Sequence, residues 1–246
     1  MKNLFYILLI ISLFSCTTSP FECEFSGQST SKSVNLSAFD IVEVNPMITL
    51  TIFQDTDRKI DISTDKDVIE NISYEIQGNK LILSNHTDCL IENSDAVAHI
   101  TLYTPELKKI IANTELTIQS GNTWHFNDLT IVCDNINEGT NNVADFDLEV
   151  NMNKLKIRSN GSSVYKVAGT CNDLSVGFYG SGPSFWGQNL QANKIYVFQR
   201  SQADMHLYPI DQITGELFGY GDIYLYHRPT SVNINKHYSG HIYYVD

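Results

Sequence analysis

Residues 155–182 read LKIRSNGSSVYKVAGTCNDLSVGFYGSG, and this stretch decides the fold. It holds two short runs with apolar residues at alternate positions, 155–157 and 174–176, and each run leads into a glycine, Gly161 or Gly180. Alternation with a period of two is expected of a strand that has one buried face. The stretch therefore predicts a strand, a glycine turn, a second strand and a second glycine turn.

The same glycine turn recurs through the C-terminal half at intervals of 18 to 22 residues. The positions in step are Gly121, Gly139, Gly161, Gly180, Ser201 in place of a glycine, Gly219 and Gly240. Glycine tolerates positive φ, so we expect it to turn the chain sharply. A fixed period indicates stacked repeats, and a unit of about twenty residues is too short for a crossover through a helix, which takes roughly 30. We predict an all-β protein, a parallel β-helix (β-solenoid) with coils of about twenty residues; an antiparallel β-sandwich is the alternative.

The N-terminus is predicted to be a signal peptide, residues 1–15. Its apolar run, 4–14, is too short to span a bilayer and follows a basic residue. The ending LFSC resembles the lipobox of bacterial lipoproteins, which implies cleavage before Cys16 and attachment of lipid to that residue. Thr17 follows, where lipoproteins retained in the inner membrane often carry aspartate. We therefore expect a lipid anchor in the outer membrane, with the leaflet left open.

Three segments follow the signal peptide. Residues 16–33 are polar and are predicted to form a lipidated tether. Residues 34–104 alternate as strands without the glycine period, and residues 105–246 carry it, so we expect two abutting parts of one β structure. Within the first part, Gly78-Asn79 is predicted to join two strands, and residues 65–72 are predicted to form one short helix.

Charge and cysteine content exclude several classes of function. The chain carries 16 basic and 28 acidic residues, a net charge of −12, which argues against binding of nucleic acid and against docking to anionic lipid by charge. Apart from Cys16, the cysteines are Cys23, Cys89, Cys133 and Cys171, none in a CxxC pair, so we expect no zinc site. An oxidising envelope permits disulfides, and buried free thiols are equally consistent with the spacing.

Several motifs, taken in order, resemble one known family. They are FDIVEV at 39–44, ITLTI at 48–52, GNKLIL at 78–83, YTPELKKI at 103–110, GYGDIY at 219–224 and SGHI at 239–242. Together they resemble the "putative auto-transporter adhesin, head GIN domain" family over about residues 33–246. The resemblance implies a right-handed β-helix, secreted or held by a lipid anchor in bacteria of the Bacteroidetes type, with no established catalytic residues. The turns at 138–140, 160–162 and 200–202 depart from the Gly-Ser-Gly pattern of that family.

Candidate metal and catalytic motifs are weak. His237 and His241 would lie about 13 Å apart in an extended strand. The carboxylate pairs lack the ligand number of a calcium loop; they are Asp55 with Asp57, Asp65 with Asp67, and Asp145 with Asp147. Residues 180–182 lack the G-x-S-x-G pattern of a nucleophile elbow. We expect no metal, no cofactor and no catalysis.

The strongest candidate for recognition is aromatic. If Met205, Leu207, Ile223 and Leu225 point inward, alternation turns the residues between and after them outward. The outward set is His206, Tyr208, Tyr224 and Tyr226, with Trp186 extending it on the preceding coil. Tyrosine offers an apolar ring and a hydroxyl, which suits sugar stacking or protein contact. The alternative is that these rings merely cover the flank of the repeats, because β-structure favours aromatic residues.

These observations predict a non-enzymatic lipoprotein of the cell envelope, an adhesin-like module that binds a glycan or a protein. One alternative is a lyase-like enzyme acting on polysaccharides, for which the repeats offer only scattered Arg158, Arg200 and Arg228. Another is a self-assembling structural β-helix, against which the acidic composition and the anchor weigh. Ligand identity and oligomeric state are left open.

Overall fold

The computed structural model describes residues 25–88, 96–134 and 142–245. The predicted signal peptide, residues 16–24 of the predicted tether (Cys16 among them) and Gly139 lie outside these residues. The described chain folds into 17 β-strands and one three-residue 3-10 helix, η1 (Ile69–Asn71). The prediction of an all-β protein is confirmed.

The strands of the N-terminal part are β1 (Ser29–Asn35), β2 (Ile41–Val44), β3 (Ile48–Gln54), β4 (Lys59–Asp65), β5 (Ile72–Gln77), β6 (Lys80–Asn85) and β7 (Ala98–Thr104). Those of the glycine-turn part are β8 (Lys109–Ala112), β9 (Ile118–Ser120), β10 (Asp128–Cys133), β11 (Asp145–Ser159), β12 (Val164–Phe178), β13 (Ser184–Gln199), β14 (Met205–Leu217), β15 (Ile223–Leu225), β16 (Ser231–Lys236) and β17 (Ile242–Tyr244).

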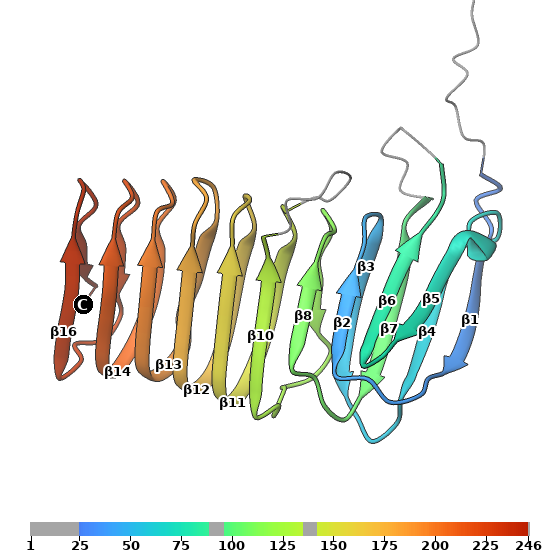
Figure 1. Cartoon of the computed structure of the whole chain (residues 1–246), viewed down its shortest axis with the longest axis horizontal. Helices are drawn as coiled ribbons and strands as arrows, with labels where there is room; N and C mark the ends of the chain where they lie inside the picture. Colours follow the sequence, from blue (N-terminus) through green and yellow to red (C-terminus); the bar gives the residue numbers. More distant parts are fainter. Residues whose placement is uncertain (1–24, 89–95, 135–141, 246) are drawn as a thin grey trace, which may run out of the picture.

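Hydrogen-bonded pairing arranges the strands in two ladders that share the long strands β11 to β14. One ladder runs β5–β6–β2–β8–β10–β11–β12–β13–β14–β16. The other runs β1–β4–β7–β3–β9–β11–β12–β13–β14–β15–β17. Joined through the long strands, they form one curled, mixed and largely parallel sheet whose strands follow one another along the long axis (Figure 1).

Pairing between successive long strands is parallel and keeps the sequence period. Leu155 lies opposite Leu174, which lies opposite Ile195, which lies opposite Ile213. Antiparallel pairs among the described strands are confined to β1–β4, β4–β7 and β5–β6, at the N-terminal end. The alternative of an antiparallel sandwich therefore does not describe the repeats.

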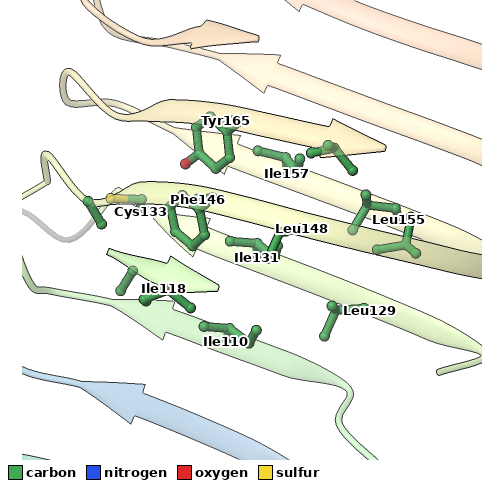
Figure 2. Close-up of a cluster of buried hydrophobic side chains, with 14 of the residues drawn as sticks. Ile110, Ile118, Leu129, Ile131, Cys133, Phe146, Leu148, Leu155, Ile157 and Tyr165 are labelled. Carbon is green, nitrogen blue, oxygen red and sulfur yellow. The ribbon is translucent and has the colours of Figure 1, made fainter. Parts of the chain in front are cut away.

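One hydrophobic core runs through the molecule because the inward side chains of stacked strands fall into rows. In β11 buried and exposed residues alternate along almost the whole strand. Ile131 of β10, Ile157 of β11 and Tyr165 of β12 belong to the packed cluster in Figure 2. Burying a side chain of this size stabilises by roughly 1.5–3 kcal/mol relative to leaving it exposed. The rows therefore hold successive repeats together.

The turn glycines work differently from the sequence prediction. Positive φ among the glycines is found at Gly27, Gly78, Gly169 and Gly215, and at none of the described turn positions in step. What excludes a side chain there is the preceding turn, because a Cβ on Gly180 would overlap the carbonyl oxygen of Asn160. The expectation that these glycines supply positive φ is wrong: Gly161, Gly180, Gly219 and Gly240 allow one turn to lie directly on another, and Gly121 lies against the Phe53 ring.

Ser201, in the slot without glycine, shows the same close stacking. Its side chain is buried, and its hydroxyl donates a hydrogen bond to the Ser181 carbonyl oxygen at 3.1 Å. The Ala203 amide donates to the same hydroxyl at 3.0 Å. A serine fits here because its hydroxyl bonds the turn beneath it.

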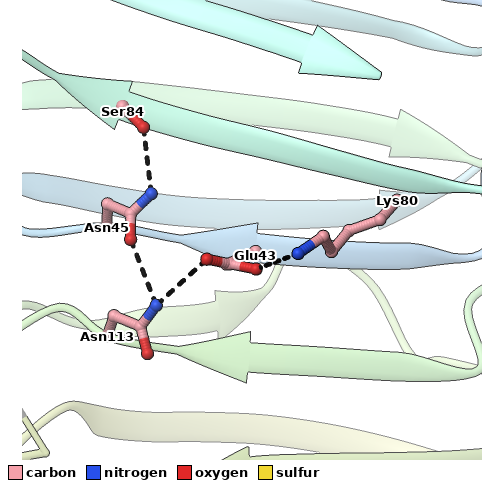
Figure 3. A network of polar contacts seen from close by, with 5 residues as sticks. All are labelled: Glu43, Asn45, Lys80, Ser84 and Asn113. Carbon is pink, nitrogen blue, oxygen red and sulfur yellow. Dashed lines mark hydrogen bonds and ion pairs between the residues drawn. The ribbon is translucent and has the colours of Figure 1, made fainter. Parts of the chain in front are cut away.

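The two parts of the chain on either side of Thr104 share one sheet. Strand β2 pairs with β8, and β3 pairs with β9. Figure 3 shows a polar network across β2, β6 and the end of β8: Asn45 donates to Ser84 at 2.9 Å, Asn113 donates to Asn45 at 3.1 Å, and Lys80 pairs with Glu43 at 2.6 Å. Side-chain contacts thus add to the strand pairing across the boundary.

Local predictions in the N-terminal part hold to different degrees. Gln77 and Lys80 face each other across a two-residue loop, so the predicted Gly78-Asn79 turn is confirmed. Of the helix predicted at 65–72, η1 alone forms, because Asp65 still belongs to β4 and Ile72 already belongs to β5. Residues 29–33 of the predicted tether lie in β1, so the sheet begins before the expected boundary. No helix in the described part has the length and hydropathy to cross a membrane.

Cys133 and Cys171 are buried free thiols. Burial raises the pKa of both groups, that of Cys171 to about 11. The Cys133 sulfur lies 3.0 Å from the Ser163 hydroxyl. Both cysteines therefore act as small core residues.

Candidate functional site

The aromatic side chains predicted to point outward are carried by β13, β14 and β15. Met205, Leu207, Ile223 and Leu225 are fully buried. The residues between them, His206 and Tyr224, therefore face away from the core. Trp186 lies opposite His206, and His206 lies opposite Tyr224. Strand register thus places these three rings in one row.

The row is a continuous stack of rings, here called the aromatic ladder: Trp186, His206, Tyr224 and Tyr243. The Trp186 and His206 centroids are 4.3 Å apart, with ring planes at 12°. His206 and Tyr224 follow at 5.0 Å and 10°, and Tyr224 and Tyr243 at 5.4 Å and 25°. Such pairs each contribute about 0.5–1.5 kcal/mol beyond the area they bury. The stacking holds the ring positions without any ligand.

Tyr243 is the member that sequence reasoning missed. It lies opposite Tyr224 in the final strand, and 45% of its surface is exposed. The signal was present, because Ile242-Tyr243-Tyr244 repeats the pattern of Ile223-Tyr224-Leu225 at a spacing of 19 residues.

The two other predicted residues lie beside the ladder. Tyr226 tilts against His206 with centroids 5.8 Å apart, and its hydroxyl lies 3.0 Å from His206 Nδ1. Tyr208 stacks on His227 at 5.3 Å instead. The structure thus brings Trp186, His206, Tyr224 and Tyr226 together and places Tyr208 in a neighbouring pair.

Partial burial sets the electrostatics of the ladder. It lowers the pKa of His206, with Asp204 opposing the shift, so the imidazole is neutral at pH 7. Burial also raises the pKa of Tyr224, so its hydroxyl stays protonated. The ladder is therefore an uncharged surface with polar edges.

Two carboxylates near the ladder, those of Asp204 and Asp222, accept hydrogen bonds from backbone amides. The Asp222 amide donates to Asp204 at 2.8 Å, and the His241 amide donates to Asp222 at 2.7 Å. The other candidate histidine, His237, pairs instead with Glu216 at 2.5 Å. Over the described ranges, no three side chains of metal-ligand type gather in one place.

A second row of rings lies near the glycine turns, and the sequence analysis did not identify it. Tyr179 stacks on Phe198 at 4.9 Å, Phe198 tilts against Phe218 at 5.4 Å, and Phe218 stacks on His237 at 4.0 Å. Arg158 lies 5.6 Å from the Tyr179 ring and pairs with Asp134 at 2.8 Å.

Three of the cavities in the described part of the chain lie on the long strands. One of about 360 Å³ is lined by polar residues that include Asn153 and Asn172, and one of about 460 Å³ by residues that include Lys154 and Lys194. The third, about 240 Å³, has Trp186 in its wall. The third is therefore the cavity that adjoins the aromatic ladder.

Fold and surface together define a class of protein: a largely parallel, curled β-sheet with a row of stacked rings on its outer face. The sequence profile of one family, the "putative auto-transporter adhesin, head GIN domain" family, matches residues 38–229. The chain belongs to this family, as the motifs of the sequence indicated. A comparison with curated proteins finds no match.

Solved structures share the fold at low sequence identity. A protein from Bacteroides fragilis described as "a putative adhesin" is 19% identical with a TM-score of 0.79, and the match covers 91% of this chain and 100% of that one. Another so described, from Parabacteroides merdae, is 13% identical with a TM-score of 0.67, covering 91% and 99%. A "putative lipid binding protein" from Parabacteroides distasonis is 16% identical with a TM-score of 0.63, covering 91% and 99%. At these identities the likeness shows the fold alone.

Proposed function

We propose that this chain is a non-enzymatic, adhesin-like lipoprotein of the cell envelope that binds a glycan on its aromatic ladder. The observation that carries the proposal is the stack of Trp186, His206, Tyr224 and Tyr243, held in place by strand register. Pyranose rings have an apolar face that packs on aromatic rings, while tyrosine hydroxyls bond sugar hydroxyls. Membership of the adhesin family supports the same role.

The fold proposed for this role is a right-handed parallel β-helix. Parallel pairing at intervals of about twenty residues supports it, and crossovers between parallel strands are right-handed in about 98% of cases. Such a rod would present the ladder on a rigid face beyond the membrane. A crystal structure of the protein decides the handedness; a left-handed course would contradict this part of the proposal.

The proposed anchor is lipid on Cys16, in the outer membrane, with residues before β1 as the tether. The support is the sequence LFSC at 13–16, because cysteine directly follows an apolar run and a small residue. Labelling cells with radioactive palmitate should mark the wild-type protein in the outer-membrane fraction. Cys16→Ala should abolish the label, and label retained on that variant would contradict the anchor.

Binding can be measured with the purified full chain on a glycan array. We expect Tyr224→Ala to weaken binding about tenfold, because the loss of one stacked ring removes about 1–1.5 kcal/mol. Tyr196→Ala is the matched control, since Tyr196 is 46% exposed on β13 but lies outside the ladder. Absence of binding to every glycan, or equal binding by both variants, would contradict the proposal. Release of unsaturated sugars from acidic polysaccharides would contradict the assignment as a non-enzyme.

A further inference from the structure

The aromatic ladder ends at Trp186, where the strand that carries it becomes irregular. Lys166 of β12 faces Trp186 of β13, and the next pair is Ala168 with Asn189. Between these two pairs β13 therefore contains one more residue than β12. Between β13 and β14 the difference is larger. Gly187 faces Leu207 and the next pair is Gln191 with Tyr208, so β13 has three extra residues where β14 has none. Strand β13 therefore bulges next to Trp186. Bulges redirect side chains and are frequent beside functional sites.

The bulge borders the cavity of about 240 Å³, here called the Trp186 cavity. Its wall includes Trp186, Gln188 and Asn189 of the bulge, Lys166 of β12 and Asp147 of β11. Pockets for drug-sized ligands measure about 300–1,000 Å³. The Trp186 cavity is smaller than that range, so its size suits one small ring rather than an extended ligand.

One face of the indole is available to that cavity. His206, on β14, covers the other face at 4.3 Å. The cavity residues on neighbouring strands all come from β11 and β12, on the side away from His206. Trp186 is 43% exposed. A flat ligand in the cavity would stack on the indole and extend the aromatic ladder by one ring.

Within the described part of the chain, the polar side chains around the Trp186 cavity are unpaired. Among the described residues, the side chains of Asp147, Lys166, Gln188 and Asn189 make no hydrogen bond or ion pair. The Gln188 amide oxygen is moreover buried without a partner. Buried acceptors of this kind are uncommon in proteins and call for an explanation. A polar ligand in the cavity would explain the unpaired oxygen, because it becomes a hydrogen-bond partner when the Gln188 amide turns toward it.

We propose that the Trp186 cavity is a binding subsite for a single pyranose ring, the ring of the glycan that lies beyond Trp186 on the aromatic ladder. The apolar face of the sugar packs on the free face of the indole. Its hydroxyls accept hydrogen bonds from Lys166 and Asn189 and donate one to Asp147. An aromatic platform with a few convergent polar groups is the usual composition of a small-ligand site. This subsite rests on the proposed function, because it takes one unit of the same glycan.

The test uses the full chain in detergent, with methyl pyranosides of the common hexoses and the oligosaccharides that contain them as probes. Trp124 is fully buried, so oxidation by N-bromosuccinimide should strike Trp186 first. We expect a matching pyranoside to slow that oxidation, and the oligosaccharide to do so at lower concentration. Protection by the methyl pyranoside alone would show that the subsite binds a single free ring. Protection by the oligosaccharide alone would show that binding needs a longer chain.

Variants locate the subsite. Lys166→Met and Asn189→Ala should each weaken binding about tenfold, as expected for loss of a hydrogen bond to the ligand. Trp186→Ala should weaken it at least as much, and Trp186→Phe should restore most of the loss because it keeps a ring. Lys156→Met is the matched control, since Lys156 is an exposed lysine of β11 that does not line the Trp186 cavity.

The outcomes separate the subsite from the proposed function. Glycan binding that depends on Tyr224 but not on Lys166, Asn189 or Trp186 would overturn the subsite. It would not contradict the proposed binding of a glycan on the aromatic ladder. A panel in which no sugar binds or protects Trp186 would overturn both. Binding that is lost in Lys166→Met and kept in Lys156→Met supports the subsite.

Discussion

The close approach of the neighbouring turn limits which residue type fits at single positions in the turns. Gly161, Gly180, Gly219 and Gly240 each lie where a Cβ would meet a backbone carbonyl oxygen of the previous turn. The constraint is one of contact between repeats rather than of backbone angle. That distinction changes what a substitution should do, because an alanine at such a site must separate two turns.

Gly180→Ala is therefore expected to lower the free energy of unfolding by about 1–3 kcal/mol, the usual cost of forcing extra atoms into a packed site. The cause is overlap of the new methyl group with the Asn160 carbonyl oxygen. Denaturation in urea measures the change. Ser181→Ala is the neighbouring control, since Ser181 is exposed and uses its backbone oxygen to accept from Ser201. A Gly180→Ala protein as stable as the control would contradict the stacking argument.

At the scale of elements, the long strands bend where their alternation breaks. In β11 the exposed and buried residues alternate up to Met152, and Asn153 and Lys154 then both lie toward solvent. Three asparagines stack at this bend. Asn172 donates to Asn153 at 3.2 Å, and Asn193 donates to Asn172 at 2.9 Å. Their amides link β11, β12 and β13 where the strands change direction.

Because Asn172 joins both of its neighbours, Asn172→Ala should destabilise more than Asn193→Ala, which loses one of these hydrogen bonds. We expect Asn172→Ala to lower the free energy of unfolding by about 1–2 kcal/mol and Asn193→Ala by about half as much, which is the usual net contribution of side-chain hydrogen bonds. Thermal and urea unfolding of the two variants against wild type measure the difference. Equal losses would contradict the argument that Asn172 bonds both neighbours, and no loss in either variant would mean that the amide stack does not stabilise the bend.

At the scale of the whole molecule, the N-terminal part and the repeats are joined by backbone pairing and by a shared core. The hydrophobic cluster extends without interruption from Phe39 to Leu225. Strands β2 and β3 lie between β6–β7 on one side and β8–β9 on the other. An early segment is thus inserted into the middle of the stack.

We accordingly expect one cooperative unfolding transition, although long repeat arrays can lose cooperativity. Removing β2 and β3 from the sheet would open the core on both sides at once. Circular dichroism reports on all strands, whereas fluorescence reports on Trp124 and Trp186. Coincident midpoints are expected in urea. Two separated transitions would show instead that the part before Thr104 is an independent unit.

The repeat period, the alternation and the outward position of Trp186, His206 and Tyr224 were predictable from the sequence alone. Each depends on local spacing, and parallel stacking repeats that spacing in register. The insertion of β2–β3 and the bulge at Gly187–Asn189 were not predictable. Backbone hydrogen bonds pair any two strands alike, so the sequence carries little information about which strands become neighbours. The tertiary structure alone decided those pairings, and with them the Trp186 cavity, because β13 has more residues there than its neighbours can match.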